Sequence, residues 1–208
     1  MRSSTPRAEQ AARRALSKRE AAYAAEVDRL LDAGLEVMRS TGTSSSPRVA
    51  DIVEAAGLSN QAFYRHFAGK EELIAAIVEA GMYRLVSYLS HLMGRESRAE
   101  DKVRVWIWGV MSQASNPEVA DATRAVVWNG RQLPGTPALA MEGMREPVAA
   151  LLVEPLRSAG RSDPERDAQV VAEAVFGRMT TFLWAGRAPS VEDVEHLVDF
   201  CVAGVTAG

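Results

Sequence analysis

The side chains best suited to a chemical task lie on one predicted short helix near position 60. Phe63 and Phe67 are one turn apart and predict its buried side. Its opposite side then carries two amides, a phenol and a guanidinium, from Asn60, Gln61, Tyr64 and Arg65. Amides read adenine edges, and a guanidinium reads guanine or phosphate. No carboxylate shares this side, although the chain has 27 acidic residues. We predict DNA contact here; an ordinary solvated helix is the alternative.

Two short helices joined by a glycine turn are expected to position this face. Ser46-Pro47 should begin the first short helix, Gly57 should end it in the left-handed conformation, and Ser59 should cap the second. A longer helix at about 20–40 precedes them, with one apolar stripe at Val27, Leu30, Leu31, Gly34, Leu35 and Met38. This arrangement is a helix-turn-helix.

Several segments at fixed offsets resemble the DNA-binding signature of the TetR family: Arg29–Leu35, Ile52–Ser59, Phe63–Phe67 and Lys70–Leu73. The strong similarity covers about residues 26–80. It implies an all-α fold of about nine helices, in which a three-helix helix-turn-helix domain at 19–69 is joined by a long helix to a ligand-binding and dimerisation domain at 70–208. A basic flexible arm at 1–18 precedes them.

The resemblance also implies roles for single residues. Ser59–Phe67 would be the recognition helix, with base edges read by Asn60, Gln61 and Arg65. The DNA backbone would be contacted by Tyr64, His66, Lys70, Ser46 and Arg48. A packed position between helices is the alternative for His66.

Charge is unevenly distributed along the chain. The net charge is −3, yet residues 1–20 hold 6 basic and 2 acidic side chains. We hypothesise that Arg13, Arg14, Lys18 and Arg19 enter a flanking minor groove or hold phosphates. A solvated disordered tail is the alternative.

Helical periodicity continues through the C-terminal part, with helices expected at about 70–93, 99–115, 118–131, 137–159, 164–186 and 190–206. Large soft apolar side chains there suit an effector pocket: Trp106, Met111, Trp128, Met144, Phe176 and Met179. Each of them taken singly is better explained as core, and the expectation that some of them line a pocket rests mainly on the family resemblance. Their abundance favours an apolar or aromatic effector.

Helix 164–186 is apolar on more than one side, so a second chain is expected to cover it. Ala168, Ala172, Ala174 and Gly177 would let a partner helix approach closely. Together with helix 137–159 this predicts a four-helix interface in a homodimer, and a two-fold dimer predicts a palindromic operator.

The function expected from the resemblance is a cytoplasmic repressor that leaves its operator DNA when a small molecule binds. The alternatives are an activator of the same fold, or a helical small-molecule-binding protein or enzyme without DNA binding. No catalytic residue, metal site, cofactor or membrane contact is expected. His66, His91 and His196 lack metal-ligand spacing, and Cys201 falls on an apolar stripe. No run approaches the roughly 18 apolar residues of a membrane span.

Overall fold

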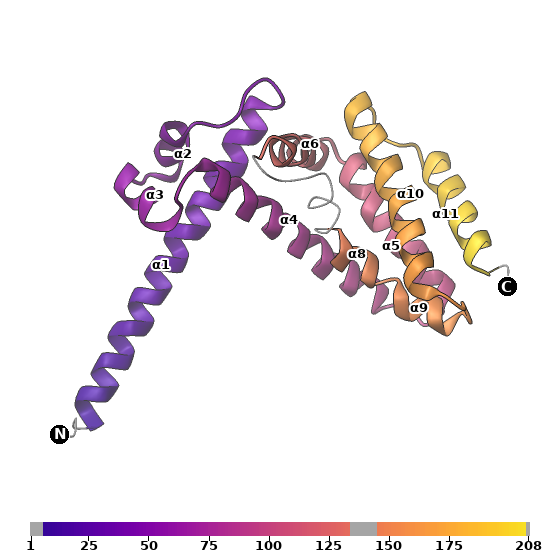
Figure 1. The fold of residues 1–208 in the computed structure, drawn as a ribbon, viewed down its shortest axis with the longest axis horizontal. Helices are drawn as coiled ribbons and strands as arrows, with labels where there is room; N and C mark the ends of the chain where they lie inside the picture. The colour runs from indigo at the N-terminus through magenta and orange to yellow at the C-terminus, as the bar shows by residue number, and fades with distance from the viewer. Residues whose placement is uncertain (1–5, 134–144, 207–208) are drawn as a thin grey trace.

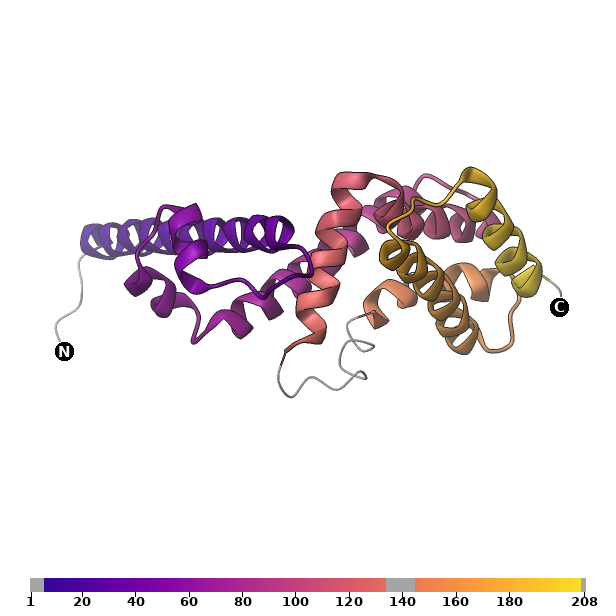
Figure 2. The same cartoon turned by 90° about the horizontal axis from the view of Figure 1, so that it is seen from above.

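The structure is a computed structural model that describes residues 6–133 and 145–206, and every regular element within them is a helix. The helices are α1 (Pro6–Thr41), α2 (Val49–Ala56), α3 (Asn60–His66), α4 (Lys70–Met93), α5 (Ala99–Ser115), α6 (Pro117–Arg131), α8 (Glu146–Ala150), α9 (Val153–Ser158), α10 (Pro164–Ala185) and α11 (Val191–Thr206). The molecule is elongated: α1–α3 form one end and α5 with α8–α11 the other, while α4 and α6 lie between them (Figures 1 and 2). The predicted all-α architecture is confirmed.

Helix α1 is much longer than predicted. It begins at Pro6 rather than near residue 20, so the prediction of a flexible arm is wrong for residues 6–18. Alanine, arginine, lysine and glutamine dominate this stretch and have high helix propensity, and proline is favoured at the first helical position. Every side chain from Gln10 to Ala25 is exposed. The prediction followed an apolar stripe, which an exposed helix does not need.

The turn between α2 and α3 forms as its residues dictate. Gly57 has φ +62°, and the N–H groups of Gly57 and Leu58 donate to the last carbonyls of α2. The hydroxyl of Ser59 accepts from the N–H of Ala62 at 3.1 Å and so caps α3. Both predictions are confirmed.

The predicted start of α2 at Ser46-Pro47 is wrong. The helix begins at Val49, and Arg48 precedes it with extended backbone and no side-chain cap. Pro47 is buried, which ties it to the core instead of to the first helical turn. The Arg48 side chain turns to Asp51 in the first turn of α2.

Two apolar cores lie along α4. The first joins α1, α2 and α3 to the start of α4, with Ile52, Phe63 and Leu73 fully buried. It continues to Val78 and includes Ala125 of α6, so it extends past the boundary expected at 69/70. The second core contains α5 and α8–α11. Within the described residues α4 alone is long and apolar enough to cross a membrane, and seven of its apolar side chains are buried in the two cores.

The segment predicted as one helix at 137–159 is broken. Residues 134–144 lie outside the described part, and the remainder forms the two short helices α8 and α9. Pro155 has no N–H to donate to the carbonyl of Leu151, which interrupts the helical ladder between them. Val148 of α8 and Leu156 of α9 are fully buried in the second core, where both helices pack against α10.

Candidate nucleic-acid interface and effector cavity

Helix α3 presents a polar face to solvent and an apolar face to the first core. Ala62 and Phe63 are buried, whereas Tyr64 is 60% exposed. The three side chains predicted to read base edges also lie on the exposed face, namely Asn60, Gln61 and Arg65. The amides, the phenol and the guanidinium therefore share one accessible face that carries no carboxylate of α3 itself.

A carboxylate of α1 joins the C-terminal end of α3 to the longest helix. The Nη2 of Arg65 donates to Oε2 of Glu26 at 2.6 Å, and Nε2 of His66 lies 2.7 Å from the same oxygen. The ring of Tyr23 meets the His66 ring edge-on, with the centroids 4.2 Å apart. Hydrogen bonds from His66 and Arg65 favour the ionised form and hold the pKa of Glu26 below its usual range.

These contacts decide between the two interpretations of His66. Its side chain is 0% exposed. It is therefore packed between α1 and α3 in this conformation, as the alternative interpretation expects, and is not open to solvent. Sequence reasoning missed Glu26 and Tyr23 altogether, because 40 positions separate Glu26 from His66 and no local pattern connects them.

Three residues predicted to hold phosphates lie at the two ends of the helix-turn-helix. The Nζ of Lys70, the first residue of α4, donates to the hydroxyl of Ser46 at 3.2 Å, so the fold brings these two together. Arg48 instead makes two bonds of 2.8 and 2.9 Å to Asp51, which raise its pKa. It remains 79% exposed, so its outer edge is accessible.

The candidate effector site is a cavity of about 560 Å³ between α1, α4, α6 and α10. Two of the predicted pocket residues, Phe176 and Met179, line it. Leu35 of α1 and Val126 of α6 also line it and were not predicted. The lining is mostly apolar, while charged groups stand among it: Arg39 is bonded to Glu36, and the guanidinium of Arg145 lies 5.1 Å from the centre of the Phe176 ring.

The other predicted pocket residues are placed elsewhere. Trp106 and Met111 are 0% exposed, belong to the second core and do not line this cavity. The indole N–H of Trp106 donates to the carbonyl of Val148 at 3.0 Å, which satisfies its one polar group. Trp128 is half-buried on α6 outside the cavity lining. Met144 lies outside the described residues.

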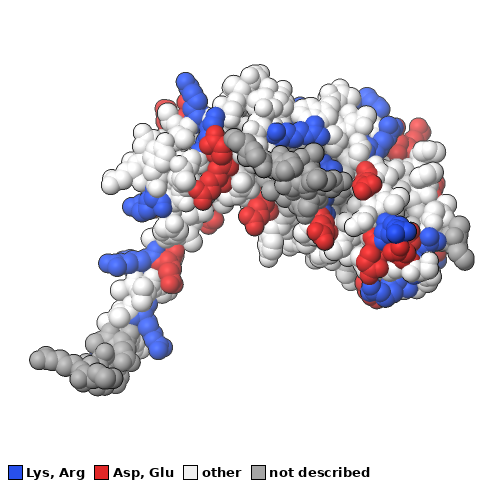
Figure 3. Space-filling view, in the orientation of Figure 1, with Lys and Arg blue, Asp and Glu red and all other residues white. Residues whose placement is uncertain are grey.

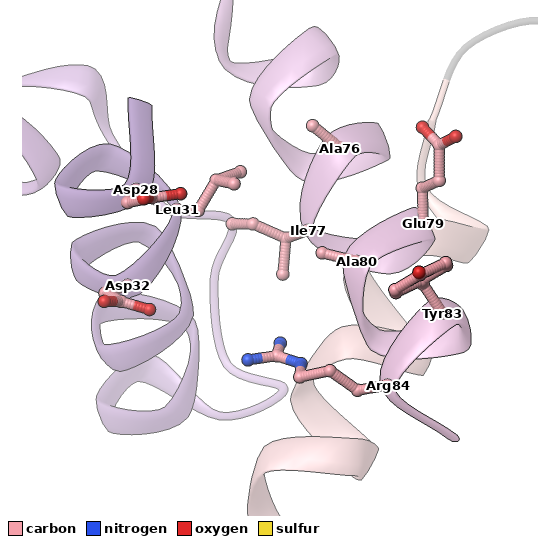
Figure 4. Close-up of a pocket in the computed structure, with 9 residues that line it drawn as sticks. All are labelled: Asp28, Leu31, Asp32, Ala76, Ile77, Glu79, Ala80, Tyr83 and Arg84. Carbon is pink, nitrogen blue, oxygen red and sulfur yellow. The ribbon is translucent and has the colours of Figure 1, made fainter. Parts of the chain in front are cut away.

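A second hollow of about 560 Å³ lies between α1 and α4 and is more polar. Carboxylates of Asp28, Asp32 and Glu79 border it, and Arg84 reaches from α4 toward α1 (Figure 4). Asp32 and Arg84 line this groove and the effector cavity alike. The apolar lining makes the first cavity the better match for the effector expected from the sequence.

The comparisons with known proteins agree with this geometry. A sequence model of the TetR family of bacterial regulatory proteins matches residues 30–77, which span most of α1 beyond the protrusion, α2, α3 and the start of α4. No curated protein matches the sequence.

Solved structures share the fold over nearly the whole chain. A protein described as a transcriptional regulator from Pseudomonas aeruginosa PAO1 aligns with TM-score 0.70 and 20% identity, over 88% of this chain and 90% of its own. A TetR-family regulator from Mesorhizobium loti gives 0.67 and 19%, over 89% and 96%. The regulator FadR from Bacillus subtilis, in complex with stearoyl-CoA, gives 0.60 and 17%, over 86% and 97%. Residues 30–77 thus match the sequence model of the TetR family, and the whole chain shares the fold of solved transcriptional regulators, some of them described as TetR-family proteins.

Proposed function

We propose that the protein is a cytoplasmic repressor that binds a palindromic operator as a dimer and leaves it when an apolar or aromatic molecule enters the cavity. The observation that carries the DNA-binding part is the exposed face of α3, which presents amides, a phenol and a guanidinium and has no carboxylate of its own. Such a face suits the donor and acceptor pattern of the major groove.

On this proposal Asn60, Gln61 and Arg65 read base edges, and Tyr64 contacts phosphate. Arg65 gives only one of its nitrogens, Nη2, to Glu26, and its side chain is 55% exposed. The rest of its guanidinium is therefore available to a guanine or a phosphate.

Further groups would fix the domain on the DNA backbone. Ser59 caps the N-terminus of α3, where backbone N–H groups point outward and favour an anion such as a phosphate. Ser46, Arg48 and Lys70 hold the adjoining phosphates, with Arg48 sharing its charge between Asp51 and the DNA. These contacts position α3 in the groove and add no sequence information.

The dimer interface is assigned to α10 and α11. The outward stripe of α10 holds small residues between two larger apolar ones: Val170, Ala174, Gly177, Thr181 and Trp184. On α11, Phe200 is 72% exposed. A groove of about 480 Å³ between the two helices is bordered by Arg178, His196 and Phe200, so these faces are continuous.

Helix α11 replaces the 137–159 segment as the expected partner of α10 in the four-helix interface. Val148 and Leu156 are already buried within their own chain and have no apolar surface left to give. A two-fold dimer through α10 and α11 would present two copies of α3 to successive turns of DNA, about 34–36 Å apart or a multiple of that.

The cavity offers a direct route from effector to DNA. Leu35 and Arg39 belong to α1, the helix that holds Arg65 of α3 through Glu26. Val126 lies on α6, which also places Ala125 in the first core. A ligand that favours a different separation of α1 and α6 lowers DNA affinity by its differential affinity for the two arrangements.

The test is release of bound DNA. The protein on DNA from upstream of its own gene is titrated with stearoyl-CoA, which a structural neighbour binds, and with a panel of uncharged aromatic compounds. A volume near 560 Å³ lies within the range of small-molecule sites. Release of the DNA by a micromolar concentration of a compound that also raises the thermal midpoint of unfolding supports repression. A compound that binds and strengthens DNA binding would contradict ligand-induced release.

A further inference from the structure

The N-terminal half of α1 protrudes from the body as an exposed helix (Figure 1). The contact between Glu26 and Arg65 marks where α1 passes the end of α3. The nineteen residue steps from Glu26 back to Arg7 extend the helix by about 28 Å beyond that level, at 1.5 Å per step. This is longer than the helix needs for packing on α2 and α3.

The protrusion is basic and its charges are unpaired within the described residues. Arg7, Arg14 and Lys18 are spaced i, i+7 and i+11 and so form one stripe, while Arg13 and Arg19 lie about 120° around the helix from it, one on either side. There is no aspartate or glutamate from residue 10 to residue 19. Lysine and arginine side chains stand out along this part of the surface (Figure 3). A concentrated positive charge on a chain of net charge −3 indicates a polyanionic partner at this end.

We propose that residues 7–19 are a second DNA-binding element, which holds phosphates of the duplex flanking the half-site that α3 reads. The inference rests on the proposed function, because it places the same DNA beside α3. A reach of about 28 Å corresponds to roughly eight base pairs at 3.4 Å each. The element would lengthen the operator footprint and add affinity that depends on salt and not on sequence.

The helical form also selects the mode of binding. A helix with its side chains is about 10–12 Å wide, whereas the minor groove is about 6 Å wide. The folded helix of residues 7–19 is therefore too wide to enter a flanking minor groove as a whole, and only single arginine or lysine side chains fit into it. Contact with phosphates along the backbone remains, and the Arg7–Arg14–Lys18 stripe suits it.

The test compares two duplexes recovered from a random pool by the full-length protein, one trimmed to the selected site and one with ten extra base pairs at each end. The variant R7Q/R14Q/K18Q removes the stripe. R98Q/R157Q/R166Q removes the same charge from exposed positions on the far domain and is the matched control. Binding is measured by fluorescence anisotropy at several salt concentrations.

Wild type and control are expected to bind the longer duplex at least tenfold more tightly, and the stripe variant is expected to lose that preference. For the stripe variant on the longer duplex, the slope of log K against log salt concentration should become smaller in magnitude by about 3 to 5. Each lost phosphate contact contributes about 0.9, and a dimer has two stripes. Equal salt slopes and an equal preference for the longer duplex in all three proteins would overturn the proposal. The same result is expected if the protrusion pairs with acidic groups of a second copy instead of with DNA.

A second variant tests the helical form. Ala15→Pro keeps every charge but interrupts the exposed helix between Arg14 and Lys18. It is expected to lose most of the flank preference while binding the trimmed duplex as wild type does, and full retention of the preference would contradict a rigid helical element. If wild type binds neither duplex above the level of random DNA, the proposed function fails. Tight binding to the trimmed duplex without any flank effect overturns only this inference.

Discussion

Glu26 of α1 holds Arg65 of the recognition helix at 2.6 Å, and the same oxygen lies 2.7 Å from the buried ring of His66. One carboxylate therefore fixes both the exposed guanidinium and the C-terminal end of α3. Farther along α1, Leu35 and Arg39 line the effector cavity. The Glu26 contacts and the shared first core thus connect the part of α1 at the cavity with α3.

This contact predicts an acid-sensitive contribution to stability. The pKa of Glu26 lies below the ordinary 4.5 in the folded protein. Its contribution is therefore present above about pH 4.5 and is lost as the pH falls through the lower folded value. Urea unfolding of Glu26→Gln should lose less stability than wild type between pH 7 and pH 3.5. Glu79→Gln, at an exposed site on α4, is the control, and an equal loss in all three proteins would contradict the assignment.

The cap of α3 predicts a measurable cost. Ser59→Ala leaves the N–H of Ala62 without its partner and should lower the free energy of unfolding by about 1 kcal/mol. DNA affinity should fall as well, because α3 begins at this cap. Ser59→Asp, which also accepts a hydrogen bond, should restore the stability measured in urea. A neutral Ser59→Ala would show that packing of Phe63 alone holds α3.

The cavity can be filled from Gly81 of α4. A Cβ at this position meets nothing within 4 Å, and the residue lines the cavity. Gly81→Phe should fold, gain helix propensity and bind DNA as wild type does, while the effector concentration for half-release rises at least tenfold. The control is Ala80→Phe, one residue away, which lines the polar groove of Figure 4. If Ala80→Phe blocks release and Gly81→Phe does not, the effector site is that groove.

The dimer assignment depends on the small outward stripe of α10. Gly177 is exposed, and a Cβ there meets nothing within 4 Å. Gly177→Glu would place two carboxylates and their desolvation cost at a two-fold interface, so sedimentation velocity should show a shift from dimer to monomer. The control is Ala150→Glu, which adds the same charge at an exposed position of α8. If Ala150→Glu shifts the protein from dimer to monomer and Gly177→Glu does not, the interface would include the 137–159 segment instead.

Local sequence patterns predict much of the fold. The bounds of α4, the left-handed Gly57 and the Ser59 cap follow from the chemistry of a few adjacent residues, and the structure has each as predicted. The start of α1 was missed because an exposed helix needs propensity alone and leaves no apolar period. The predicted 137–159 helix includes Pro155, and the missing N–H of this residue interrupts the helix.

The candidate sites depend more on tertiary contacts. The exposed face of α3 was predictable because Phe63 and Phe67 fix its rotation. The Glu26 contact and the cavity walls were not, since they bring together residues from helices far apart in sequence. Trp106 shows the limit directly: its size suited a pocket, and only the structure shows it buried with its indole bonded to Val148.

The most direct test of DNA recognition by α3 is a fluorescence-anisotropy titration against the DNA upstream of the protein's own gene, at two salt concentrations. Wild type is compared with Gln61→Ala/Arg65→Ala and with Gln132→Ala/Arg98→Ala, which removes the same residue types from other exposed positions. We predict nanomolar, salt-sensitive binding by wild type and control, and a loss of at least about 30-fold in the α3 variant. Equal affinity of all three proteins would show that the exposed face of α3 does not read this DNA and would contradict the account.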